Sequence, residues 1–392
     1  MNERQLFFQH IGQTSDSPLA LEIEKAEGIY LYDTSGKAYI DLISGVSVSN
    51  IGHRNPKVVE AVKNQVDKYM HLMVYGEYIQ SPQVQLAKLL TEVLPESLNS
   101  VYLVNSGSEA NEGALKLAKR YTHRSEMIAF KKAYHGSTHG ALSVMGEESF
   151  KNSFRPLLPD VRLLEFNNVF DLEQITEKTA CVIVEPIQAE AGIILPENDF
   201  LLKLRQKCTQ TGALLIFDEI QVGFGRTGML FAFENYGVVP DIITFAKGLG
   251  GGMPIGAFVA DKNVMDSFKT NPILGHITTF GGHPVSAAAA LASLQFILDN
   301  KIVEKVNEKG DLFRRLLVHP KIKSIRGKGL FLAVELTDFD MVLSTLHKSI
   351  ALGVVFDWFI FCDNYFRIAP PLTITESEIE QACSILLNAL SL

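Results

Sequence analysis

The chain has 392 residues, more than a single hydrophobic core usually organises, so two domains are expected. Hydrophobic residues make up 47% of the sequence and charged residues 20%, as in an ordinary globular enzyme. The net charge of −8 comes without a lysine- or arginine-rich run, which argues against nucleic acid and anionic membranes as partners.

The N-terminal segment predicts a cytoplasmic protein that opens with a hairpin. The first residues lack a basic region followed by an apolar core, so we expect no signal peptide. No window approaches the roughly 20 apolar residues of a membrane span. Residues 28–41 have the pattern of a β-hairpin with its turn at Asp33–Gly36.

Short apolar strands alternate with amphipathic helices through the middle of the chain. The strands are almost continuously apolar, as expected for a mainly parallel sheet that is covered on both faces. We predict helices at Ala110–Tyr121 and Phe200–Gly212, and strands at Val101–Asn105, Met127–Phe130, Cys181–Glu185, Leu214–Asp218, Ile242–Ala246 and Ala257–Ala260. This order indicates an α/β domain that binds its ligands at the carboxyl ends of the strands.

The C-terminal part predicts a smaller α+β domain. We expect a long amphipathic helix from about Leu291, strands near Ser324–Leu336 and a terminal helix from Thr375. We combine these elements with the N-terminal hairpin into one domain built from both termini. The predicted limits are residues 50–290 for the large domain, and residues 1–49 and 291–392 for the small one.

Lys247 and Asp218 are the leading candidates for catalytic residues. Lys247 follows the apolar stretch Asp241–Ala246 and begins a glycine-rich turn, so burial should lower the pKa of its amine and make it a nucleophile. Asp218 ends another apolar strand. A Schiff-base lysine and a carboxylate partner for a pyridinium nitrogen are what a pyridoxal phosphate enzyme requires. A structural lysine at a glycine turn is the alternative for Lys247 taken alone.

Two further segments fit an aromatic, phosphorylated cofactor. Ser106–Glu112 opens a helix with small residues, which makes a phosphate site at the helix N-terminus, although a plain serine N-cap is the alternative. In Ala133–Gly140, Tyr134 is placed to stack on an aromatic ring. His135 and His139 lie on this loop without a nearby carboxylate ligand, so we expect hydrogen-bonding histidines and no metal.

A glycine-rich segment and an arginine near the C-terminus are two further candidate binding features. Gly223–Gly228 matches the dinucleotide fingerprint GxGxxG, but it does not join a strand directly to a helix, so we expect no nicotinamide site. Arg367 precedes two prolines and is the candidate for binding a substrate carboxylate, because a guanidinium binds carboxylates in a bidentate fashion. A surface arginine in a strand is the alternative.

Taken together, these motifs resemble the class III pyridoxal-phosphate-dependent aminotransferases, the group of acetylornithine, ornithine and 4-aminobutyrate aminotransferases. The resemblance covers nearly the whole chain. It rests on ordered motifs at Gly28–Asp33, Gly52-His53, Asn105–Glu112, Val184–Gln188, Asp218–Gly228, Ala246–Gly248, Thr279–Gly282 and Arg367–Leu372.

The resemblance implies fold type I, pyridoxal 5'-phosphate (PLP) as cofactor and a homodimer with shared active sites. It implies that Lys247 forms the internal aldimine and that Asp218 pairs with the pyridine nitrogen. Glu190 and Arg367 look like the family's switch pair, in which Glu190 releases Arg367 for the α-carboxylate of glutamate. The remaining implied cofactor contacts are Gly107 and Ser108 on the phosphate, Tyr134 and Ile220 on the ring faces, Gln221 on the phenolic oxygen, and Thr279 on the phosphate of the neighbouring subunit.

The expected reaction is transfer of an amino group from an ω-amino donor to a keto acid, with 2-oxoglutarate expected, by a ping-pong mechanism. The donor can be acetylornithine-like, a diamine or a β/γ-amino acid. Ser137 replaces the family arginine that binds the donor's distal carboxylate, Val46 replaces a tyrosine of ornithine enzymes, and His283 replaces an asparagine. We therefore hypothesise a donor without a free distal carboxylate, while acetylornithine stays open. A decarboxylase or aminomutase on the same scaffold is the alternative.

Overall fold

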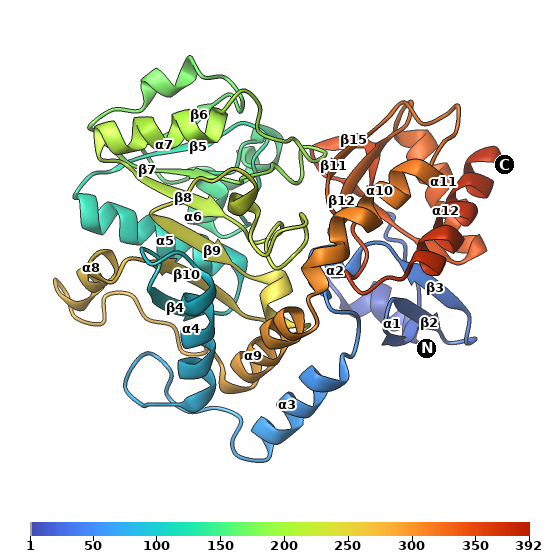
Figure 1. Ribbon diagram of the computed structural model, residues 1–392, viewed down its shortest axis with the longest axis horizontal. Coiled ribbons are helices and arrows are strands. Elements are labelled where there is room, and N and C mark those ends of the chain that lie inside the picture. The colour runs from blue at the N-terminus through green and yellow to red at the C-terminus, as the bar shows by residue number, and fades with distance from the viewer. Residues whose placement is uncertain (1) are drawn as a thin grey trace.

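A seven-stranded, mainly parallel sheet forms the centre of the computed structural model, which describes residues 2–392 (Figure 1). Strand β10 runs antiparallel to both of its neighbours, β4 and β9, while the other pairs are parallel. In spatial order the strands are β4 (Ser100–Val104), β10 (Gly256–Ala260), β9 (Ile242–Phe245), β8 (Leu214–Asp218), β7 (Thr179–Val184), β5 (Glu126–Phe130) and β6 (Val161–Leu164).

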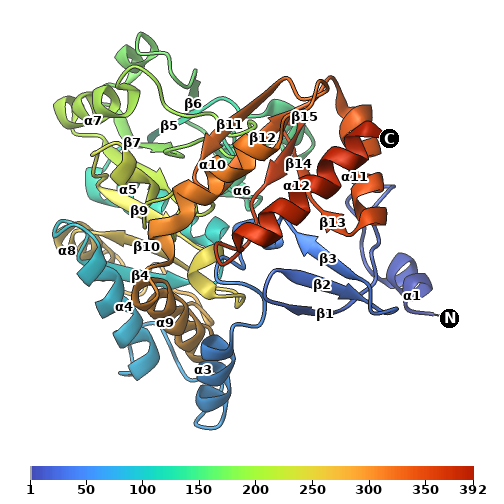
Figure 2. The same ribbon diagram turned by 45° about the vertical axis from the view of Figure 1, so that its right-hand side comes forward.

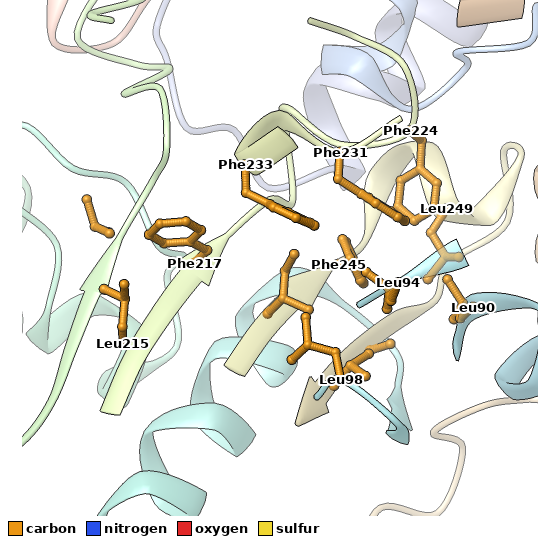
Figure 3. Packing of buried hydrophobic residues seen from close by; sticks show 14 of the residues in the cluster. Leu90, Leu94, Leu98, Leu215, Phe217, Phe224, Phe231, Phe233, Phe245 and Leu249 are labelled. Atoms are coloured by element: carbon orange, nitrogen blue, oxygen red, sulfur yellow. The ribbon is translucent and has the colours of Figure 1, made fainter. Parts of the chain in front are cut away.

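Both faces of this sheet are buried, which explains the continuous apolar runs of its strands. Along β8, Leu214 and Ile216 join the hydrophobic cluster under helix α5, whereas Leu215 and Phe217 join the larger cluster on the opposite face. Figure 3 shows the second set, in which Phe217 and Phe245 pack with neighbouring phenylalanine and leucine side chains. Because successive residues of a strand point to opposite faces, a strand must be apolar at every position to pack against both hydrophobic clusters.

The remaining strands form two four-stranded sheets beside the large one (Figures 1 and 2). Their order is β1 (Ile23–Glu27), β2 (Tyr30–Asp33), β3 (Ala38–Asp41) and β13 (Val354–Val355) in one sheet, and β11 (Ser324–Lys328), β12 (Phe331–Glu335), β15 (Cys362–Ile368) and β14 (Asp357–Phe359) in the other. Strand β13 pairs in parallel with β3, so the two ends of the chain share a sheet. A separate hydrophobic cluster spans residues 29–42 and 306–390.

The helices cover these sheets. They are α1 (Glu3–His10), α2 (Ser44–Ser47), α3 (Pro56–Val66), α4 (Ser81–Val93), α5 (Gly107–Thr122), α6 (His139–Ser143), α7 (Phe200–Thr211), α8 (Lys262–Met265), α9 (Pro284–Asp299), α10 (Val306–Leu316), α11 (Phe339–Leu352) and α12 (Glu376–Ser391). None of the helices in residues 2–392 combines the length and the apolar character that crossing a membrane would need.

The predicted elements agree with the structure except near Leu291. The expected hairpin, the six central strands and the helix after Thr375 are present within one or two residues of their predicted limits. The helix expected from about Leu291 is wrong in its start and its character, because α9 already begins at Pro284. Its alanine-rich surface packs against α3, α4 and the turn after Lys247, so it is apolar on more than one side. The domain limits at residues 49/50 and 290/291 stay a prediction.

Arg226 joins three distant parts of the chain, and its side chain is completely buried. Its Nη1 donates to the carbonyl oxygens of Leu330 (3.0 Å) and Pro370 (2.6 Å), and its Nη2 donates to Ser44 Oγ (3.2 Å) and Asn50 Oδ1 (2.5 Å). Burial lowers its pKa to about 9, so the guanidinium still carries its charge at neutral pH. The GxGxxG pattern around it continues into turns and a short 3₁₀ segment, not into a nucleotide-binding helix.

Replacing Arg226 with methionine should lower the free energy of unfolding by about 3 kcal/mol or more, because buried acceptors would lose a charged donor. Chemical unfolding of the purified protein measures this change. Arg155→Met is the matched control, since Arg155 makes an exposed ion pair with Glu148 and should cost less than about 1 kcal/mol. Equal losses in the two variants would contradict the role assigned to Arg226.

Candidate active site

A cavity of about 170 Å³ lies at the carboxyl ends of the central strands. Strand β8 ends in the cavity at Asp218, and Lys247 follows the end of β9. Glu185 follows the end of β7, and the loop after β5 carries Tyr134 into the cavity. The N-terminus of α5 closes one side. Its lining residues are Ser106, Gly107, Ser108, Tyr134, His135, Gly136, Glu185, Asp218, Ile220, Gln221, Val222 and Lys247. The sheet therefore gathers side chains that are far apart in the sequence.

Lys247 begins the 3₁₀ turn η5 (Lys247–Gly250) directly after β9. Its φ of 46° lies in the left-handed region, which is strained for a non-glycine residue and is typical of functional positions. Its amine donates to Gln221 Oε1 at 3.2 Å. Burial lowers the pKa of this amine, and Glu190 opposes the shift only in part. The neutral, nucleophilic form is thus favoured at a lower pH than for a free lysine.

Asp218 is buried and fixed by three donors. Its Oδ2 lies 2.8 Å from Asn111 Nδ2 and 2.8 Å from His135 Nδ1, and its Oδ1 accepts from the Ile220 N–H at 3.0 Å. Asn111 is itself held by the His135 carbonyl oxygen and by Thr244. This network fixes the position of a negative charge at the base of the cavity, where it can face a cationic ring nitrogen.

The start of α5 forms a cradle for an anion. Ser106 caps the helix by accepting from Glu109 N, so the N–H groups of Gly107 and Ser108 lie in the first turn, which has no helical acceptor for them. A Cβ on Gly107 would come within 2.8 Å of Ile220 Cδ1, and a Cβ on Gly136 within 2.1 Å of Ser108 Oγ. A side chain at Gly107 would therefore push Ile220, and one at Gly136 would meet Ser108 at a φ of 125° that side chains rarely adopt.

Glu185 organises the loops on either side of the cavity. Its carboxylate accepts from Tyr134 N and from Ala189 N, both at 3.0 Å. Burial raises its pKa to about 7 against the opposing effect of His135. Gln221 also lines the cavity, and its Nε2 is buried without a hydrogen-bond partner, as is Nε2 of His135. Two residues of the cavity lining thus carry a polar atom without a partner in the protein.

Arg367 and Glu190 form a buried ion pair near Lys247. Arg367 Nη2 lies 2.9 Å from Glu190 Oε2, and its Nε lies 3.4 Å from Asp357 Oδ1. Its Nε and Nη1 make no hydrogen bond. Burial acts to lower the pKa of Arg367, but the two carboxylates outweigh it and the net shift is upward. Burial raises the pKa of Asp357 to about 6. The guanidinium therefore stays charged, and Glu190 occupies the Nη2 donor that a substrate carboxylate would need.

The structure brings most of the predicted site residues together. Gly107, Ser108, Tyr134, Asp218, Ile220, Gln221 and Lys247 line one cavity. Arg367 and Glu190 contact each other, and both affect the charge of Lys247. Thr279 does not line this cavity and is exposed. Among residues 2–392, no three His, Cys, Asp or Glu side chains are grouped to hold a metal ion.

The sequence did not single out two residues of this site, Asn111 and Asp357, which contact Asp218 and Arg367 respectively. His135 makes a hydrogen bond as expected, but the expectation that no carboxylate lies near it is wrong, because the fold brings Asp218 within 2.8 Å. Asn111 could have been predicted as part of a polar network, because an amide on the buried face of a helix needs a polar partner. Asp357 gave none, since its partner is ten residues along the chain on a paired strand.

Val46 lies in an unusual backbone turn beside the lysine segment. Residues 44–47 have φ values of 48°, 64°, 60° and 63°, so their backbone is left-handed. These residues form the short helix α2, which contacts the turn η5. A β-branched residue is strongly strained at a positive φ. The surrounding contacts, which include Arg226 on Ser44, must hold this turn in place.

Comparisons with known proteins agree with this geometry. The family model described as aminotransferase class-III matches residues 11–390. The chain is 39% identical over 394 residues to the acetylornithine aminotransferase of Methanopyrus kandleri, an alignment that covers 100% of this chain and 99% of that protein. It is 36% identical to the LysW-aminoadipate semialdehyde/glutamate semialdehyde transaminase of Sulfurisphaera tokodaii, with 92% of each chain covered.

A solved structure matches the fold over nearly the whole chain. The ornithine aminotransferase of Toxoplasma gondii, which has partial occupancy of PLP at its active site, superimposes with a TM-score of 0.91 and 30% identity. The match covers 99% of this chain and 93% of that one. The fold and the cofactor of these proteins fit the cavity described above.

Proposed function

The chain belongs to the class-III aminotransferases, and on this basis we propose how its own residues perform the reaction. It is a PLP-dependent transaminase that acts on ω-amino donors. The observation that supports the assignment of residues most strongly is the position of Lys247, whose enclosed amine shares one cavity with Asp218 and the α5 N-terminus.

The residues present fit PLP. Gly107 and Ser108 would hold its phosphate at the start of α5, with Tyr134 and Ile220 on either side of the ring. Asp218 would face the ring nitrogen, and the unpartnered Nε2 of Gln221 would reach the phenolic oxygen. When bound, PLP supplies an electron sink for the pair that remains after a substrate C–H bond breaks.

Lys247 is the proposed carrier of the substrate proton. Its lowered pKa provides a neutral amine that can accept a proton at the substrate carbon and return it elsewhere. Asp218 would supply a negative charge to the same cavity, and its bonds to Asn111 and His135 prevent it from turning away. These residues would therefore supply both the base and the charge that directs electrons within one site.

Arg367 is the proposed anchor for the acceptor, which we take to be 2-oxoglutarate. Glu190 masks the guanidinium while the amine donor is bound, and it must leave when an α-carboxylate takes its place. Nη1 makes no hydrogen bond, and Nη2 is released when Glu190 leaves, so the two terminal nitrogens would supply the two parallel donors that a carboxylate needs.

We further propose a cytoplasmic homodimer. Thr279 is exposed and lies outside the cavity, so it would contact the phosphate in a neighbouring subunit. Sedimentation of the holoenzyme measures the assembly. A monomer with full activity would contradict the shared site.

A half-reaction tests the function. The holoenzyme, mixed with an amine donor and no keto acid, should release pyridoxamine phosphate on denaturation. Adding 2-oxoglutarate should restore PLP and yield glutamate. Release of carbon dioxide, or no conversion of the cofactor with any amine, would contradict a transaminase.

Replacing Arg367 with glutamine should raise KM for 2-oxoglutarate by about 10²-fold, because the loss of a buried partner for a carboxylate costs about 2–5 kcal/mol. Activity with a donor that lacks a carboxylate should change far less. Steady-state kinetics with each substrate varied separately measures both effects. Arg162→Gln is the control, since Arg162 makes an exposed ion pair with Glu126. An unchanged KM would remove Arg367 from acceptor binding.

A further inference from the structure

We propose that three aromatic rings, Tyr134, Phe150 and Phe361, form a wall that selects amine donors with an uncharged, apolar far end. This inference rests on the proposed function. The ring of Phe361 meets that of Phe150 edge-on with centroids 5.2 Å apart, and its centroid lies 6.4 Å from that of Tyr134. Tyr134 lines the Lys247 cavity, so the wall continues the cavity outward.

The wall is tied to the residue that masks Arg367. Phe361 lies in the turn between β14 and β15, and its N–H donates to the Glu190 carbonyl oxygen at 3.2 Å. The N–H of Ile360 lies 3.3 Å from Glu190 Oε2, the oxygen that also pairs with Arg367. The turn that carries Phe361 is therefore hydrogen-bonded to the residue that pairs with Arg367. While Glu190 masks Arg367, a donor beside the wall meets rings and a guanidinium that is already paired.

Most cations around the wall are already engaged. Lys151 is buried and donates to the carbonyl oxygens of Ser143 and Met145, and Arg155 pairs with Glu148. Arg326, on the other side of the turn, donates to the carbonyl oxygens of Ala191 and Gly192 and lies over the ring of Tyr365.

Ser137 and Lys132 are the other two polar residues near the wall. Ser137 offers only a hydroxyl, 3.3 Å from that of Tyr134. Lys132 is exposed near Cys362 and could reach a ligand only from the surface.

This arrangement penalises a charged donor end. A carboxylate pressed against three aromatic rings would lose water without gaining an ionic partner, whereas an alkyl or aryl end gains apolar contact. We expect a preference of about 10²-fold in kcat/KM for the apolar donor, the size of effect that such pockets reach.

Matched donors test the wall. The holoenzyme is mixed with hexylamine, cadaverine or 5-aminopentanoate, and conversion of the cofactor is followed in a single turnover. We expect hexylamine to react about 10²-fold more efficiently than 5-aminopentanoate. Phe361→Ala and Phe150→Ala should each reduce the hexylamine rate about tenfold and leave the glutamate half-reaction within about twofold. Phe154→Ala is the control, because Phe154 lies on the adjacent turn and is partly exposed like Phe150, whereas Phe150 is the one that packs on the ring of Phe361.

Opposite results would overturn the inference. A preference for 5-aminopentanoate or acetylornithine, lost in Lys132→Ala, would show that a surface lysine binds a donor carboxylate. Ser137→Arg should improve turnover of these carboxylated donors, and no improvement would count against the missing cation as the cause. If glutamate converts the cofactor but hexylamine does not, only the wall is refuted. If neither does, the transaminase function itself fails.

Discussion

Replacing Lys247 with alanine should reduce turnover by at least about 10⁴-fold, the upper range for removing a group that moves a proton in the rate-determining step. The amine is both the attachment point proposed for PLP and the only base in the described chain that we place at the reacting carbon. The fold should survive, because the side chain makes one hydrogen bond, to Gln221. Steady-state kinetics and unfolding of the purified variant measure both outcomes.

The control for this variant is Lys262→Ala, which removes a lysine from an exposed ion pair with Asp266 and should leave kcat unchanged. Added methylamine should restore part of the activity of Lys247→Ala, because a free amine can enter the space of the missing side chain. Activity within tenfold of the parent would refute the role of Lys247.

Replacing Asp218 with asparagine should reduce kcat by about 10²- to 10³-fold, the cost of removing one preorganised electrostatic contact. The amide has nearly the same shape but only one acceptor oxygen, so it can keep either the contact from Ile220 N–H or those from Asn111 and His135 while the charge is lost. The KM for the amine should change little. The same kinetic assay separates the two constants.

A modified cofactor shows whether Asp218→Asn loses activity because the negative charge is missing or because the site changes shape. PLP methylated at the ring nitrogen carries a permanent positive charge and does not need a carboxylate to keep it. Reconstitution with this analogue should recover much of the lost kcat in the variant and little in the parent. Failure to recover would assign Asp218 a structural role within the His135 network.

Local patterns were enough to predict the central sheet and the residues at its strand ends. Strand β8 ends at Asp218 and strand β9 ends two residues before Lys247, so Asp218 and Lys247 could be placed at one edge of the sheet from the sequence alone. The start of α5 was equally readable, because small residues after a strand are typical of a phosphate site.

Contacts between distant segments could not be read in this way. The pairing of β14 with β15 brings Asp357 beside Arg367, and the turn between these strands places Phe361 next to Phe150, which lies more than 200 residues earlier. The three segments that Arg226 contacts share no local pattern either. The start of helix α9 was predicted too late in the sequence, because burial on several sides removed the polar stripe that marks an amphipathic helix.

The attachment site of the cofactor tests the account most directly. The holoenzyme should be treated with borohydride, digested and mapped by mass spectrometry. We predict a stable pyridoxyl group on Lys247 and on no other lysine, and no label in Lys247→Ala. A label on a different residue, or an unlabelled protein that still transaminates, would contradict the assignment of Lys247.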